Sequence, residues 1–167
     1  MAWPAKGVAN LFLDLAEESG LPIDPLTMQK LVYFAEGWHL ALLDTSLVIE
    51  QFEAWKRGPV VPALYHALKG YGSSPIRDCL VVAEIDIPRQ RIQTVEARRP
   101  TETESQDLVR EVWRVYRRYS GGQLVALTHQ QGSPWEMTWR QANGAPDARI
   151  PKDHIRAWFR AEADRST

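Results

Sequence analysis

The chain of 167 residues is poor in cysteine and has no long apolar run. Its single cysteine, Cys79, excludes an internal disulfide framework and any zinc site built from several cysteines. Cys79 lies in an apolar stretch, which is typical of a buried thiol. A membrane-spanning helix needs about 18 or more apolar residues, whereas the longest candidate, residues 31–43, is interrupted by Glu36, Gly37 and His39.

The N-terminal segment lacks the continuous apolar region of a secretory signal peptide. Residues 1–6 are followed by an amphipathic stretch that carries Asp14, Glu17 and Glu18. A chain with one cysteine also suits a reducing compartment. We therefore expect a cytoplasmic protein that does not have the membrane as a partner.

An excess of charge of either sign is also missing. The chain has 20 Lys and Arg residues against 21 Asp and Glu residues, which gives a formal net charge of −1. A strongly basic balance would indicate nucleic acid or an anionic membrane as a partner, and this balance does not. No helix-turn-helix module is set apart from the core, so DNA is not an expected partner.

No pattern typical of a catalytic, cofactor or metal site occurs in the sequence. The histidines His39, His66, His129 and His154 do not lie three or four residues from one another, as pairs of metal ligands on a helix do. The phosphate-binding glycine motifs are missing, and Ser133 is placed to cap a helix rather than to act as a nucleophile. We therefore expect no catalytic residue, metal, cofactor or enzymatic activity.

What the sequence does contain is the apolar spacing of helices. Hydrophobic residues make up 44% of the chain, and in most segments they recur at every third or fourth position, as on one face of a helix. Proline and small polar residues supply start signals at the beginning of several segments. We predict a mainly α domain of about six helices, drawn from segments at 8–18, 25–43, 62–70, 101–121, 124–129, from 133 onward and around 155–159.

Single residues decide three details of these helices. Thr101 and Glu104 have the spacing of a capping box, so we expect them to begin a long helix that ends at Gly121-Gly122. Gly37 lies inside a helix that is apolar on most sides. Because glycine there costs stability relative to alanine, we expect a neighbouring element to approach closely at this position.

β-structure is predicted in two places. Residues 47–55 suggest a short strand pair or an extended segment, which the stretch 56–59 breaks. Residues 79–87 are β-branched and apolar and residues 91–95 alternate, which predicts a hairpin with its turn near residues 88–90. The fold class is therefore mainly α, a compact helical domain with a small β-hairpin or short antiparallel sheet.

The chain has the length of one domain, with a core that buries about two-thirds of the unfolded surface. No internal repeat, low-complexity tract or linker divides it. We expect residues 1–167 to form one domain with its core at about residues 8–160. The polar tail, residues 161–167, is expected to fray.

Two motifs in the first half of the chain are specific. Residues 26–40 read LTMQKLVYFAEGWHL and residues 52–65 read FEAWKRGPVVPALY, and Leu127-Thr128-His129 later precedes Trp135. Together they resemble the Panacea-domain family, the phage-associated GepA-like proteins that include the SocA-type antitoxins. That family has a helix of the form LQKLLYFAQGWHL, followed by F-x-AW-x-x-GPV-x-P-x-LY and a later Leu-Thr-His. The resemblance spans residues 8–159.

The departures from the family pattern are small. Met28 stands in the helix before Gln29-Lys30, and Arg57 occupies a position where an aromatic residue is common in the family. Residues 73–99 match nothing firmly. The resemblance implies an antitoxin of a bacterial or phage toxin–antitoxin system, which neutralises a protein toxin encoded beside it by direct binding. Because the family domain is paired with many unrelated toxins, the resemblance does not identify the toxin.

The resemblance also supplies the candidate toxin-binding residues, which are Trp55, Arg57, Gly58, Pro59, Tyr65, Thr128, His129 and Trp135. Their alternative role is structural, with Gly58-Pro59 fixing a turn and with Trp55 and Tyr65 in the core. A neutralising surface needs rigid Trp, Tyr and Arg side chains and no reactive group.

A second candidate surface lies in the poorly matching segment, where variation would suit varied partners. Its candidate residues are Arg89, Arg91, Arg98 and Arg99.

Three other functions remain open. The first alternative is a proteolytic adaptor or interaction module that delivers a bound protein to a protease. The second alternative is a transcriptional regulator of its own operon, and the third is an uncharacterised enzyme.

Overall fold

The computed structural model describes residues 1–166, and Thr167 lies outside the described residues. Within residues 1–166 the helices are α1 Ala5–Ser19, α2 Pro25–Leu43, α3 Pro62–Leu68, a 3₁₀ turn at Lys69–Tyr71, α4 Thr103–Tyr116, α5 Gly121–Thr128, α6 Pro134–Gln141 and α7 Lys152–Arg165. The strands are β1 Phe52–Trp55, β2 Gly58–Val60, β3 Val81–Asp86, β4 Arg91–Glu96 and β5 Arg149–Ile150. The predicted mainly α fold with a small β component is confirmed. No helix in residues 1–166 has the length and apolar character to cross a membrane.

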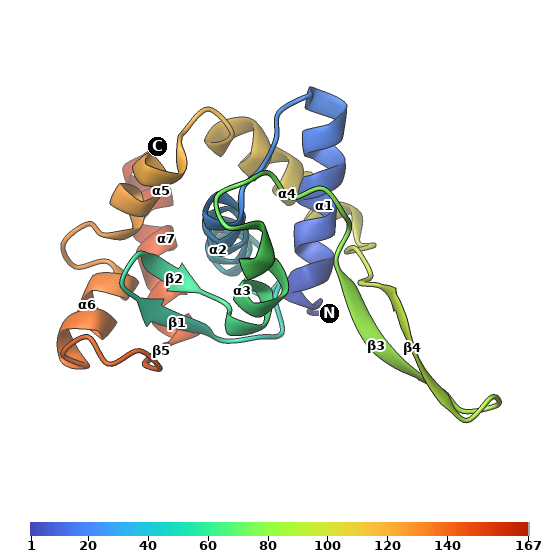
Figure 1. The fold of residues 1–167 in the computed structure, drawn as a ribbon. Helices are drawn as coiled ribbons and strands as arrows, with labels where there is room; N and C mark the ends of the chain where they lie inside the picture. Colours follow the sequence, from blue (N-terminus) through green and yellow to red (C-terminus); the bar gives the residue numbers. More distant parts are fainter. Residues whose placement is uncertain (167) are drawn as a thin grey trace.

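Helix α2 lies at the centre of the fold, between α1, α4 and α7 (Figure 1). It begins as predicted, because Asp24 accepts a hydrogen bond from the backbone N–H of Thr27 at 2.8 Å and Pro25 is the first helical residue. Its residues from Met28 to Leu40 are buried except for Trp38, which is half-buried. A helix that is apolar on most sides is stable only when neighbours cover all of it, as they do here.

Two contacts attach α7 to α2. An ideal β-carbon at Gly37 would lie 2.2 Å from the ring of Phe159, which confirms the close approach predicted at this glycine. The buried carboxylate of Glu36 lies 2.7 Å from Nζ of Lys152 and accepts a hydrogen bond from the backbone N–H of Leu47 at 2.8 Å. The ion pair and the hydrogen bond together offset the free-energy cost of removing this carboxylate from water.

The larger sheet has three strands in the order β2-β1-β5, all antiparallel. Its register pairs Trp55 with Gly58, so only Lys56 and Arg57 form the turn between β1 and β2. The prediction that residues 56–59 break the strand is therefore wrong for Gly58 and Pro59, which belong to β2. Strand β5 was not predicted, because two residues carry no recognisable period.

The second sheet is the predicted hairpin, in which β3 and β4 pair from Val81 opposite Glu96 to Asp86 opposite Arg91. We refer to residues 81–96 as the hairpin arm. Figure 1 shows this arm projecting beside α1, away from the helices. The arm is held at its base, where the buried side chain of Asn10 bonds to Leu80 and Ala97. The prediction that Cys79 is buried is wrong, because this residue is exposed at the approach to the arm.

Several helix ends differ from the prediction. Helix α4 begins at Thr103, after Glu102, which forms no side-chain cap; the Glu102 carboxylate accepts a hydrogen bond from Trp3 Nε1 at 2.8 Å. The capping box expected at residues 101–104 is therefore wrong. Helix α4 also ends at Tyr116 rather than at Gly121-Gly122. Helix α7 continues to Arg165, so most of the tail expected to fray is helical.

Candidate partner-binding site

The structure brings the motif at residues 52–65 and the later motif residues to one place, around the turn between β1 and β2. The ring of Trp55 meets the ring of Tyr65 edge-on, with 4.8 Å between centroids. On the other side of β1, Trp135 Nε1 donates a hydrogen bond to the backbone oxygen of Trp55 at 2.7 Å. These contacts join α3, β1 and α6. Trp55 is half-buried and Tyr65 is exposed, so neither is a core residue.

Gly58 sits where the chain has no room for a side chain. Its φ of +112° lies in the region that favours glycine, and an ideal β-carbon would lie 2.8 Å from both Cε of Lys30 and Oγ1 of Thr128. The oxygen of Pro59, the next residue, accepts a hydrogen bond from Nζ of Lys30 at 3.0 Å. The Gly-Pro pair therefore has a structural part to play, because it lets β2 pass directly over Lys30 and α5.

Lys30 and Gln29 hold β2 from below but were not selected from the sequence as site residues. The Gln29 amide exchanges two hydrogen bonds with the backbone of Val61, at 3.0 and 3.1 Å. Lys30 is fully buried. Burial, and then the charge of Arg57, lower the pKa of Lys30 to about 7 from its ordinary value of 10.5. The sequence carried a signal for this site, since an amide and an amine interrupt the apolar stripe of α2.

An aromatic stack borders the site on the side of α5 and α6. The imidazole of His129 lies on Trp135 with 3.7 Å between ring centroids and 3° between planes, and Trp135 stacks in turn on Trp139 at 5.3 Å. Burial, and then the charge of Lys30, lower the pKa of His129. Its Nε2 is buried and has no hydrogen-bond partner in the described part of the chain. Thr128 is buried behind Gly58 and donates its hydroxyl proton to the oxygen of Val125 at 2.8 Å.

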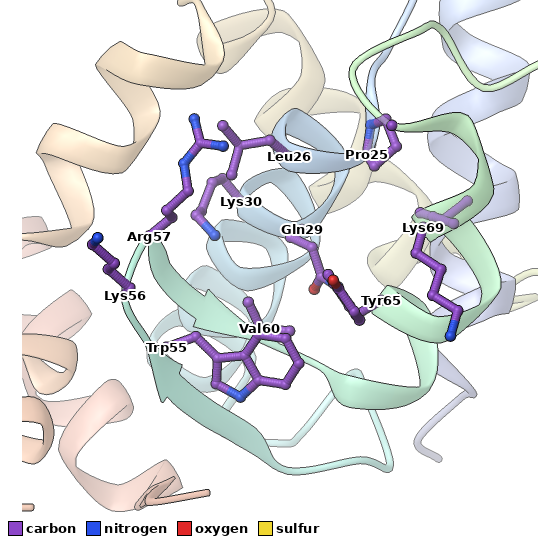
Figure 2. Close-up of a pocket in the computed structure, with 12 residues that line it drawn as sticks. Pro25, Leu26, Gln29, Lys30, Trp55, Lys56, Arg57, Val60, Tyr65 and Lys69 are labelled. Carbon is purple, nitrogen blue, oxygen red and sulfur yellow. The ribbon is translucent and has the colours of Figure 1, made fainter. Parts of the chain in front are cut away.

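A pocket of about 400 Å³ opens between the β1–β2 turn, α2 and α3. Figure 2 shows Lys30 between Arg57 and Gln29, with the ring of Trp55 below them in this view. We call it the Lys30 pocket. Its volume lies within the range of ligand-binding clefts. Of the eight predicted toxin-binding residues, Trp55, Arg57 and Tyr65 line this pocket, while the other five pack around or behind it.

The four arginines predicted as a variable partner surface do not form one surface. Arg89 and Arg91 lie near the tip of the hairpin arm, where both pair with Asp86, at 3.4 and 3.7 Å. Arg98 and Arg99 follow its base. The guanidinium of Arg99 lies 2.6 Å from the carboxylate of Asp14 on α1. Arg99 thus helps to attach the arm to α1, whereas Arg89 and Arg91 pair within the arm itself.

Sequence reasoning missed the most exposed apolar surface of the arm. Ile85, Ile87 and Ile92 are 71%, 77% and 75% exposed. Ile85 and Ile92 are directly opposite each other in the register, so their side chains lie on the same face of the hairpin. Ala83 and Val81, two and four residues before Ile85, are exposed on that face as well. We call this the isoleucine face of the arm.

Within residues 1–166, no group of three or more His, Cys, Asp or Glu side chains is placed to hold a metal ion. His39 illustrates the reason. Its two ring nitrogens lie 2.6 Å from the backbone oxygen of Thr45 and 2.9 Å from Oγ of Ser105, so both are already occupied inside the core.

Comparison with known proteins places this site in a family. The family model described as "Antitoxin SocA-like, Panacea domain" matches residues 28–136, which include the Lys30 pocket residues from Gln29 to Lys69 and the whole hairpin arm. The chain belongs to the SocA-like antitoxin family. A relative from Caulobacter vibrioides, named Antitoxin SocA, is 36% identical over 140 residues, which cover 84% of this chain and 71% of the relative. No solved structure matches the chain.

Proposed function

We propose that this protein is an antitoxin that neutralises a cognate protein toxin by binding it directly in the bacterial cytoplasm. Membership of the SocA-like antitoxin family supports the antitoxin role. The observation that carries direct binding is the isoleucine face of the projecting hairpin arm. Contiguous exposed apolar surface marks protein–protein contacts, since monomeric proteins otherwise avoid it.

The energetics of the arm support this proposal. Burying a fully exposed isoleucine stabilises a complex by about 1.5–3 kcal/mol, and Ile85, Ile87 and Ile92 are all more than two-thirds exposed. A two-stranded hairpin is at best marginally stable on its own. Here its base is fixed by Asn10, so less ordering entropy is lost when a partner packs against the arm.

We also propose that neutralisation requires no chemistry by the chain itself. Desolvation, and then the carboxylate of Glu96, raise the pKa of the Cys79 thiol, which disfavours the reactive thiolate. No hydroxyl or thiol in residues 1–166 forms a hydrogen bond with the ring of His129, as a nucleophile paired with its base would.

The test is co-expression with the protein encoded by the neighbouring gene, each under its own inducible promoter, in a bacterial host. We expect the neighbour alone to arrest growth, and this chain to restore growth and to co-purify with an undiminished amount of the neighbour. A harmless neighbour contradicts the proposal. Rescue without a complex, accompanied by faster loss of the neighbour, contradicts direct inhibition and supports the adaptor alternative.

A pair of substitutions tests the role of the arm. The double variant Ile85→Lys, Ile92→Lys is expected to abolish co-purification and rescue while its circular dichroism spectrum stays that of the wild type, because both side chains are exposed. The control is Leu42→Lys on α2, where the leucine is 61% exposed but lies outside the arm. Equal rescue by the double variant and the control would rule out the isoleucine face as the contact.

A further inference from the structure

The Lys30 pocket carries charge of one sign. Four cationic side chains line it, those of Lys30, Lys56, Arg57 and Lys69, and no Asp or Glu is among its lining residues. The chain as a whole has a net charge of −1, so this concentration of positive charge is local. A recess lined by one sign of charge and by apolar walls focuses its electric field and attracts groups of the opposite sign.

Lys30 lacks the partner that a buried ammonium group normally has. Its side chain is fully buried, yet across residues 1–166 no carboxylate lies within ion-pair distance of its Nζ, which donates only to the oxygen of Pro59. The same helix shows the usual arrangement in the contact of Glu36 with Lys152 at 2.7 Å. Buried charges are ordinarily paired, because their loss of water is otherwise uncompensated. The depressed pKa of Lys30 agrees with a missing counter-ion.

The remainder of the pocket suits an apolar body attached to that anion. The rings of Trp55 and Tyr65 form one wall, and Leu26, Val60 and Leu68 line the rest. The cations of the rim, Lys56 and Arg57, are exposed on the β1–β2 turn, where the surface of another protein can reach them. Trp, Tyr and Arg are the residue types that most often dominate the free energy of protein–protein binding.

We infer that the Lys30 pocket receives an acidic side chain of the toxin together with the apolar or aromatic residue beside it. The exposed guanidinium of Arg57 meets the carboxylate, the buried ammonium group of Lys30 attracts it from beneath β2, and Trp55 and Tyr65 pack against the apolar part. This inference rests on the proposed function and adds the chemistry of the toxin segment that is recognised.

The test compares the affinities of variants for the toxin encoded by the neighbouring gene, measured by calorimetry at one salt concentration. Arg57→Gln is expected to weaken binding at least about tenfold, which corresponds to about 1.4 kcal/mol, and Lys30→Met to weaken it similarly. The matched control is Arg110→Gln, an exposed arginine on α4 that pairs with Asp107 and lies outside the pocket; its affinity should stay within about twofold of wild type. Because Arg57 is exposed, its variant keeps the fold even if Lys30→Met does not.

A charge exchange identifies the occupant. Exposed Asp and Glu residues of the toxin are replaced singly by Lys, and each toxin variant is measured against wild type and against Arg57→Glu. We expect one toxin variant that binds wild type weakly and Arg57→Glu more tightly.

Failure of the wild-type antitoxin to bind the unmodified toxin would contradict the proposed function itself. Binding by wild type with no loss in Arg57→Gln overturns only the inference about the pocket. A second result would also overturn only that inference. If Arg57→Gln loses binding of inorganic phosphate but keeps its affinity for the toxin, the pocket is a site for small anions.

Discussion

Gly58 shows how one residue couples the motif to the site. Within the family-type block Trp55–Tyr65, position 58 favours glycine because an ideal β-carbon there would lie 2.8 Å from side-chain atoms of Lys30 and Thr128. The glycine therefore has a packing reason and a conformational reason, and both act on the floor of the Lys30 pocket. A residue that looks like a turn signal in the sequence is in fact part of a strand.

Gly58→Ala is expected to destabilise the fold by about 1–3 kcal/mol, because alanine at this positive φ is strained and its methyl group would meet Lys30 and Thr128. Urea unfolding monitored by tryptophan fluorescence measures the change. The control is Gly70→Ala, where no atom lies within 4 Å of an added β-carbon, so the change should stay within about 0.5 kcal/mol. Equal midpoints for both variants contradict the packing argument.

At the scale of elements, the hairpin arm depends on one side chain of α1. Asn10 is buried and its amide donates to the oxygens of Leu80 and Ala97, at 3.0 and 3.1 Å, and accepts from the backbone N–H of Leu80 at 2.7 Å. An ideal β-carbon at Gly7, one helical turn earlier, would lie 1.8 Å from the oxygen of Arg98, so α1 lies directly against the base of the arm.

Asn10→Ala is expected to lower the free energy of unfolding by about 2–3 kcal/mol, because it leaves buried backbone groups of Leu80 and Ala97 without partners. Amide exchange in residues 81–96 should accelerate more than in α2. The control is Lys6→Ala, which removes only an exposed hydrogen bond from the same helix to the oxygen of Val81. Unchanged exchange in the arm of Asn10→Ala contradicts its anchoring role.

The elements themselves were largely predictable, and their junctions were not. Helical spacing and the Asp24-Pro25 signal gave α2 correctly, since local propensity and burial agree there. The division between α4 and α5 was predicted but placed too late, because the capping box of Ser120 and Gln123, which begins α5, was not recognised. The expectation at Thr101 failed because the helix begins at Thr103, which leaves Thr101 outside it, and Glu102 at the N-cap position bonds to Trp3, a partner 99 residues away.

At the scale of the whole molecule, the uncompensated amine of Lys30 affects stability. Its pKa is lowered to about 7 in the folded chain from 10.5. Between these two values the unfolded chain binds a proton that the folded chain has lost, so the stability contributed by this group rises with pH. Below about pH 7 both states hold the proton and the contribution is constant. The charge of Arg57 lowers the pKa of Lys30, and the charge of Lys30 in turn lowers the pKa of His129.

Lys30→Met should remove this slope. We expect the free energy of unfolding of wild type, relative to the variant, to increase between pH 7 and 9 by at most about 1.4 kcal/mol per pH unit. Urea unfolding at three pH values within this window measures it, above the range in which the lowered pKa of His129 matters. Parallel curves for the two proteins would show that Lys30 keeps an ordinary pKa.

The candidate site was predictable only in part at this scale. The resemblance selected Trp55, Arg57 and Tyr65, which do line the pocket, but the chain topology that brings Thr128, His129 and Trp135 beside them is long-range. The arm was predicted as a hairpin, whereas the outward direction of its isoleucines was not. A strand with apolar residues on one face gives no sign of whether the chain itself covers that face.

The attachment of the arm only at its base has a consequence for the lifetime of the antitoxin. A hairpin that is attached to α1 near residues 80, 81 and 97 and projects beyond the helices is open to cleavage by cellular proteases. A toxin that covers the isoleucine face would shield the same residues. Occupied molecules would then outlast unoccupied ones, and the supply of free antitoxin would depend on continued synthesis.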